Sequence, residues 1–302
     1  MPKLLFALLL TAGLTGPIQA QQAPAPDDPS SPPIVVEGER NPGKTIDRFV
    51  SNLTPAPMGG QLGRFEDPVC PVALGLPSTE GTLVRDRLRQ VAAAVGMRVA
   101  PAPCIPNLYV LVGRDKKEVI QGLDRQFPAL VAGLSRRDVR DLIAIPGPVA
   151  SWQILDRIGA DGMPLSAARM GGDATPVRIV RTIGSPSRIS QQTKVKFVAT
   201  LIVFEARALN GVTTRQMADY AAMRTFAGTD PARQGPLPAS SILGLFDPGM
   251  APAEAPASVT WWDFAFLKSL YASSNALTAS GQRGEMERIV ARELSKVPAD
   301  ER

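Results

Sequence analysis

Lys194–Phe204, with the sequence KVKFVATLIVF, is the longest apolar run of the chain after its N-terminus. It is rich in β-branched and aromatic residues, which favours a strand buried on both faces. Asn210-Gly211 interrupts the chain shortly afterwards, and a stretch with helical spacing follows from 213 to 227. Thr213 is a suitable cap for the start of that helix, and Gly228 is a suitable stop. The sequence therefore predicts a central buried strand followed by a core helix.

The residues before this stretch predict an alternation of strands and helices. Strands are indicated at 68–74 and 107–112, and apolar residues at helical spacing indicate helices at 83–95 and 119–127. Two strands that are joined by a helix are expected to be parallel neighbours. We therefore expect an α+β protein with a mixed sheet, in which a βαβα unit precedes the central strand and further helices end the chain.

The first twenty residues have the pattern of a secretory signal peptide. Lys3 supplies the positive charge, an apolar run occupies 4–14, and a cleavage-site pattern ends at Ala20. This apolar run is shorter than the ~20 residues that a membrane-spanning helix requires. We therefore expect a periplasmic or secreted protein with no membrane span after signal cleavage.

The mature chain is expected to begin with a Pro-rich disordered linker at 21–45, because proline and small polar residues dominate its first part. A single globular domain is expected at 46–300, with 46–150 and 151–300 as possible lobes. The apolar content of this region is ample for a sizeable core.

Cys70 and Cys104 are the only cysteines of the chain. In an oxidising compartment, an isolated pair most simply forms a disulfide. The spacing does not match the Cys-x-x-Cys pattern of redox-active sites. We expect a structural disulfide beside the first two strands.

The chain contains no histidine, and this excludes several kinds of active site. Zinc proteases and histidine-dependent serine or cysteine triads cannot be assembled. We therefore predict no catalytic residue, no metal site and no cofactor. Glu205, Asp219 and Asp263 remain as carboxylates for paired-carboxylate chemistry. Structural roles are expected instead, with Asp263 as a helix cap and Asp219 as a hydrogen-bonded core residue.

Two further motifs each have two interpretations. Gly38–Thr45, with the sequence GERNPGKT, matches the pattern of a phosphate-binding loop. Because a buried strand before it and a matching aspartate strand are both missing, we expect a turn and the start of a helix there. Trp261-Trp262 could form a ligand platform, but packing of one ring against the core is expected.

The net charge is +5, and the basic residues are concentrated between Arg157 and Lys196. One interpretation is a solvated sheet edge whose charges prevent pairing with other strands. The other is a surface for an anionic partner, either an acidic envelope polymer or an acidic protein face. That surface would consist of Arg181, Arg188, Lys194 and Lys196. Nucleic acid is not expected as a partner, because aromatic residues are scarce in this region.

The order of several segments resembles a family of uncharacterised secreted proteins of Gram-negative bacteria, some of which are similar to zincin-type metalloproteases. The likeness covers about 60–297 and is carried by four segments: Arg64–Val69, Asn107–Val112, Ser241–Phe246 and Trp262–Tyr271. In a zincin, the metal-binding helix would match 213–227. That stretch has Met217, Asp219 and Tyr220 but no ligand pair. The resemblance therefore implies a protease-like fold without metal ligands.

These observations predict an exported protein that acts in the cell envelope by binding or structure rather than by catalysis. The alternative is a carboxylate-dependent hydrolase that acts on a cell-envelope polymer. A cleft with two carboxylates about 5–10 Å apart would favour the hydrolase. A closed core helix with Asp219 fully hydrogen-bonded would favour the binding protein.

Overall fold

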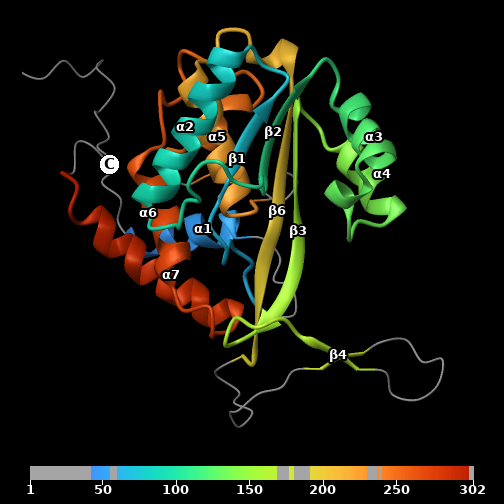
Figure 1. Cartoon of the computed structure of the whole chain (residues 1–302). Coiled ribbons are helices and arrows are strands. Elements are labelled where there is room, and N and C mark those ends of the chain that lie inside the picture. The colour runs from blue at the N-terminus through green and yellow to red at the C-terminus, as the bar shows by residue number, and fades with distance from the viewer. Residues whose placement is uncertain are drawn as a thin grey trace, which may run out of the picture. The chain divides into compact units, whose positions relative to one another are not determined.

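The computed structural model describes residues 42–54, 60–168, 177–179, 191–229, 237 and 240–298. They belong to one compact unit, in which helices cover a mixed sheet, so the predicted α+β class is confirmed (Figure 1). No helix within these ranges has the length and apolar character needed to cross a membrane. The predicted signal peptide, most of the predicted linker, Arg181 and Arg188 lie outside the described residues.

The main sheet has four strands in the order β1-β2-β6-β3. Their bounds are Pro71–Leu74 for β1, Leu108–Gly113 for β2, Val149–Gly159 for β3 and Thr193–Glu205 for β6. β1, β2 and β6 run parallel, whereas β3 is antiparallel to β6. A separate two-stranded ribbon consists of β4 (Ser166–Ala168) and β5 (Val177–Ile179).

The predicted βαβα unit is present, and its two strands are parallel neighbours as expected. It consists of β1, α2 (Ser78–Ala94), β2 and α3 (Lys116–Gln126). α2 packs on one face of the sheet, and α3 packs on the other (Figure 1). The chain therefore changes faces at the carboxyl end of β2.

Each face of the sheet has its own hydrophobic core. α3 and α4 (Arg136–Ala144) cover the smaller core. The larger core is covered by α2 and four further helices: α1 (Pro42–Leu53), α5 (Thr214–Phe226), α6 (Trp261–Ala272) and α7 (Ala279–Leu294). α1 begins four residues inside the stretch that the sequence predicted as linker. Its first residue, Pro42, suits a helix start because it lacks a backbone N–H, and Ile46 and Phe49 bury its apolar face.

The central strand β6 is buried on both faces only in its second half. All seven residues from Ala199 to Glu205 are buried, whereas Val198 is 44% exposed. The pairing with β3 shifts register here: Ile154 pairs with Ala199 but Leu155 pairs with Phe197, which leaves Val198 as the extra residue of a bulge. As a result, Phe197 and Ile202 both reach the larger core although they are five residues apart.

The predicted helix start at Thr213 and the predicted cap at Asp263 are confirmed by side-chain hydrogen bonds. Thr213 forms a reciprocal capping box with Gln216 at the start of α5. Ser135 with Asp138 and Thr260 with Asp263 form the same motif at α4 and α6. These pairs satisfy backbone N–H groups that have no partner within the helix, so they define where the helices begin.

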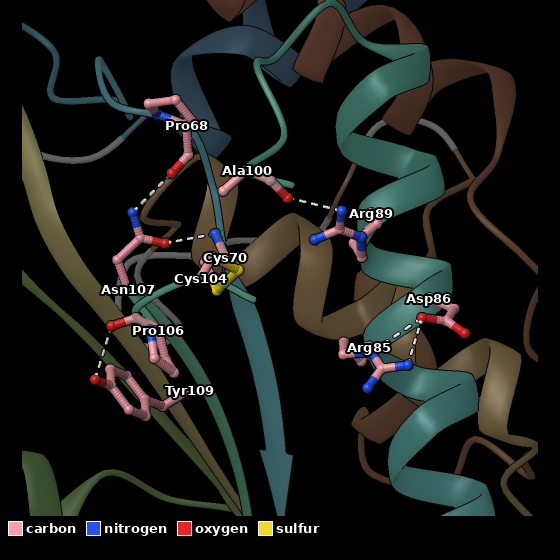
Figure 2. Close-up of a disulfide and its surroundings, with 10 residues drawn as sticks. All are labelled: Pro68, Cys70, Arg85, Asp86, Arg89, Ala100, Cys104, Pro106, Asn107 and Tyr109. Carbon is pink, nitrogen blue, oxygen red and sulfur yellow. Dashed lines mark hydrogen bonds and ion pairs between the residues drawn. A yellow bond between two sulfur atoms is a disulfide. The ribbon is translucent and has the colours of Figure 1, made fainter. Parts of the chain in front are cut away.

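The predicted disulfide joins Cys70 to Cys104, with a Cα–Cα distance of 6.1 Å (Figure 2). Cys70 directly precedes β1, and its N–H donates to Oδ1 of Asn107, which directly precedes β2. The N–H of Asn107 donates in return to the carbonyl of Cys70. The disulfide thus joins the segments that lead into two adjacent parallel strands, and it is consistent with an oxidising compartment.

Replacing both cysteines, as in Cys70→Ala/Cys104→Ala, is expected to lower the free energy of unfolding by about 3–4 kcal/mol, because the bridge closes a long loop in the unfolded chain. The measurement is urea denaturation of the variant beside oxidised and reduced wild type. Reduced wild type serves as the control and should match the variant. Equal stability of the oxidised and reduced wild type would contradict this expectation.

Candidate functional site

The core helix α5 is closed off from solvent from Gln216 onward. Every residue from Gln216 to Phe226 is buried, including the polar Asp219, Arg224 and Thr225. Because all of these residues are buried, no face of this part of the helix opens to a substrate. Its polar side chains are costly unless they are hydrogen-bonded inside the protein.

The Asp219 carboxylate is fully buried and accepts hydrogen bonds from three residues. Arg87 of α2 donates through Nε to Oδ1 at 2.7 Å and through Nη2 to Oδ2 at 2.9 Å. Ser258 Oγ and the N–H of Val259 also donate to Oδ2, at 2.7 and 2.9 Å. The structural role that the sequence predicted for Asp219 is therefore confirmed, because both carboxylate oxygens are buried and hydrogen-bonded.

Arg87 was not singled out from the sequence, although its position carried a signal. It lies in the apolar stripe of α2, between Val84 and Val91 and next to Leu88, all of which are buried. A charged residue on an apolar helix face implies a buried partner of opposite charge. The sequence could not show which carboxylate that partner is.

Asp219→Ala is expected to lower the free energy of unfolding by about 3 kcal/mol or more, because it leaves Arg87 without its counter-charge and the N–H of Val259 without an acceptor. Asp86→Ala, in the same region of α2, is the control. Asp86 forms an exposed pair with Arg85, and its removal should change stability by less than about 0.5 kcal/mol. Denaturant unfolding measures both, and equal losses would contradict the structural role of Asp219.

Asp263 is the second buried carboxylate, and it connects the start of α6 to the segment at 241–242. Its Oδ2 accepts from the N–H groups of Ile242 at 2.8 Å and Thr260 at 3.0 Å, and its Oδ1 accepts from Ser241 Oγ at 2.5 Å. The predicted role of Asp263 as a cap is confirmed. Burial raises the pKa of Asp263 from 3.8 to about 6, although these hydrogen bonds act in the opposite direction.

The raised pKa of Asp263 predicts a pH-dependent stability. Between the unfolded value of 3.8 and the folded value of about 6, the native state holds the proton more tightly than the unfolded chain. The free energy of unfolding should therefore fall as pH rises through this window, by about 3 kcal/mol in total.

The variant Asp263→Asn stays neutral and retains one oxygen for the two backbone donors, so it should lack this contribution. Measured against wild type from about pH 4 to pH 7, its relative stability should rise by about 3 kcal/mol. Denaturant unfolding at several pH values is the measurement. A stability difference that does not change with pH would contradict the raised pKa.

Glu205 is the third candidate carboxylate, and it ends β6 at the carboxyl edge of the parallel strands. This edge is the usual ligand position in open sheets whose helices lie on both faces. The side chain of Glu205 is 8% exposed. Oε2 accepts from Nε and Nη2 of Arg207 at 2.9 and 2.8 Å, and Oε1 accepts from the N–H of Lys116 at 3.5 Å.

An open pocket of about 410 Å³ lies over this edge. It is lined by Arg114, Asp115, Glu118, Glu205 and Arg207. Each of its carboxylates already has a partner: Glu205 binds Arg207, Glu118 binds Arg114 at 2.7 Å, and Asp115 accepts from the N–H of Lys117 as the cap of α3. The pocket therefore brings three carboxylates together, but two of them form ion pairs with arginines and the third caps a helix.

Lys116 is buried beside this pocket. Its Nζ donates to the carbonyls of Ile145 and Gly147, in the loop that leads into β3. Burial lowers the pKa of Lys116, with Glu205 and Asp115 acting in the opposite direction. The start of α3 is thereby attached to the segment that begins the antiparallel strand. The sequence carried no pattern that pointed to this contact.

The described part of the predicted basic surface contains acidic partners. Lys194 and Lys196 lie on β6 two residues apart, so they point to the same face. Lys196 Nζ forms an ion pair with Asp67 at 2.8 Å, and Asp156 of β3 lies directly opposite Lys196. Of the predicted set, only the two lysines lie within the ranges that the structure describes.

The adjacent tryptophans have different environments, as predicted. Trp262 is 8% exposed and packs on Phe49, with 5.2 Å between the ring centroids. Trp261 is 46% exposed and lies edge-to-face with Phe264 at 6.2 Å. One ring belongs to the core, and the other is available at the surface.

Within the described residues, no three or more Cys, Asp or Glu side chains are grouped so that they could hold a metal ion. Comparison of the chain with protein-family models, with curated proteins and with solved structures found no match. The resemblance to secreted zincin-like proteins therefore stays a prediction. The assignment of function depends on the geometry described above.

Proposed function

We propose that this chain is an exported, periplasmic or secreted protein that acts in the cell envelope by non-catalytic binding. The observation that carries the proposal is the state of Asp219. A carboxylate on the core helix would be the natural centre of a catalytic site, but here it is enclosed and hydrogen-bonded by Arg87, Ser258 and Val259. The disulfide between Cys70 and Cys104 supports export.

The proposed partner is an anionic envelope polymer or an acidic protein face. It would contact Arg181, Arg188, Lys194 and Lys196. The support is the excess of basic residues between Arg157 and Lys196, together with the placement of the two lysines on one face of β6. Long-range attraction from such a cluster weakens as salt screens the charges.

A second function, carboxylate-dependent hydrolysis of an envelope polymer, is favoured by the pocket at the carboxyl edge of the sheet. Glu205 is desolvated there, and Asp115 and Glu118 line the same cavity. The ion pair with Arg207 argues against it, because Oε2 of Glu205 already accepts two hydrogen bonds from that guanidinium.

The experiment compares two triple variants that each remove three positive charges. Arg188→Gln/Lys194→Gln/Lys196→Gln should elute from an anionic polymer column at clearly lower salt than wild type, because its charges form the proposed surface. The control is Arg85→Gln/Arg137→Gln/Arg288→Gln, which neutralises exposed residues elsewhere. It should shift elution less.

Equal shifts for the two variants would mean that retention on the column depends only on the net charge of the protein. The proposed surface would then be abandoned. Incubation with the same polymer also tests the second function. Release of soluble fragments that disappears with Glu205→Gln would replace the binding role by hydrolysis.

A further inference from the structure

A second candidate binding site lies between the start of α6 and the end of α7, helices that pack side by side (Figure 1). A cavity of about 280 Å³ is lined by Trp261, Phe264, Glu293, Lys296, Val297 and Pro298. Four of these residues are apolar, and the exposed ring of Trp261 lies beside Phe264. The volume is near the lower end of the roughly 300–1,000 Å³ range of ligand pockets, so the site suits a small ligand.

The exposure of Trp261 distinguishes this site from ordinary surface packing. The other two tryptophans, Trp152 and Trp262, are 4% and 8% exposed, whereas Trp261 is 46% exposed. Burial of a tryptophan contributes a large favourable free energy because its apolar area is large. The exposed part of the Trp261 ring is therefore apolar surface that a ligand could cover.

The charged residues that line the cavity, Glu293 and Lys296, have opposite charges, and a second lysine, Lys268, lies next to them. Glu293 binds two lysines: Lys268 Nζ donates to Oε2 at 2.9 Å, and Lys296 Nζ donates to Oε1 at 2.8 Å. The hydrogen bonds from Lys296 and Lys268 lower the pKa of Glu293, so it is ionised at neutral pH. Together with Lys268, whose Nζ lies 5.5 Å from the ring centroid of Phe264, these groups have one positive charge in excess, and it lies beside the lining of the cavity. Each ammonium has three N–H donors and gives one to Glu293, so donors remain for a ligand.

We propose that this cavity binds a small amphiphilic monoanion, in which a flat or compact apolar body carries one carboxylate. The apolar body would lie against Trp261 and Phe264, and the carboxylate would accept hydrogen bonds from Lys296 at the rim. This site is separate from the proposed basic surface on β6 and does not depend on the function proposed for it.

The geometry also sets the order of preference among ligands. Lys296 is 57% exposed and Lys268 36%, so water screens the ion pair with the ligand. A screened pair contributes little, and we expect about fivefold weaker binding when the carboxylate is replaced by a hydroxyl. An ammonium in the same place would meet like charge and should bind more weakly still.

The test uses three probes with one body: 3-phenylpropanoate, 3-phenylpropanol and 3-phenylpropylamine. Binding is followed by NMR through the indole N–H signals of the full-length protein. The expected order of affinity is carboxylate, alcohol, amine, with the largest shift in the signal of Trp261. Failure of the carboxylate to bind, or equal affinity for all three probes, would overturn the proposal.

Two variants separate the roles of the two sides of the cavity, and their affinities are measured by calorimetry because Trp261→Ala removes the indole N–H signal of Trp261. Trp261→Ala should weaken the carboxylate and the alcohol alike, by about tenfold, because it removes the apolar surface. Lys296→Gln should weaken only the carboxylate, to the level of the alcohol. Arg288→Gln, an exposed change elsewhere on α7, is the control and should leave all affinities unchanged. A carboxylate affinity that Lys296→Gln does not alter would contradict the assigned role of the lysine.

Discussion

The burial of α5 on every side is the constraint on which the rest of this structure depends. From Gln216 onward its polar side chains are buried, so each is costly unless it finds a hydrogen-bond partner inside the protein. Asp219 finds Arg87 on α2 and the backbone at Val259. Gln216 donates to the carbonyls of Pro252 and Pro256. These contacts attach the neighbouring helix α2 and the loop at 247–260, just before α6, to the centre of the molecule.

The sheet connects the buried core to the surface at the carboxyl edge of its parallel strands. β6 is covered on both faces only beyond its bulge at Val198, and its buried half leads to the carboxyl edge at Glu205. At that edge, α3 begins and the loop before β3 is held by Lys116. The edge has the position of a ligand site in folds of this kind, but its carboxylates are held by arginines and by a helix start. The topology thus provides a location for function without fixing a reaction there.

The buried charged side chains Asp219, Asp263 and Lys116 are all hydrogen-bonded within the fold, and the two sites proposed above lie at the surface. They have two different chemistries. The lysines of β6 have acidic neighbours, and the contact proposed for them with a large anionic partner would be weakened by salt. The cavity at Trp261 combines apolar rings with a charged rim, which suits a small amphiphilic anion. The two sites therefore call for different ligands.

The sequence by itself determined the elements whose signals are local. These elements are the apolar run at 194–204, the βαβα pattern, the caps at Thr213 and Asp263 and the pairing of the only two cysteines. The first three depend on neighbouring residues, and the cysteine pairing follows because no other cysteine is present. The export signal is of the same kind, although it stays a prediction. Only the tertiary structure decided that Arg87 meets Asp219, that β3 joins β6 with a bulge, and that Trp261 lines a cavity. These contacts join residues that are far apart in the chain, and many alternative partners satisfy the same local rules.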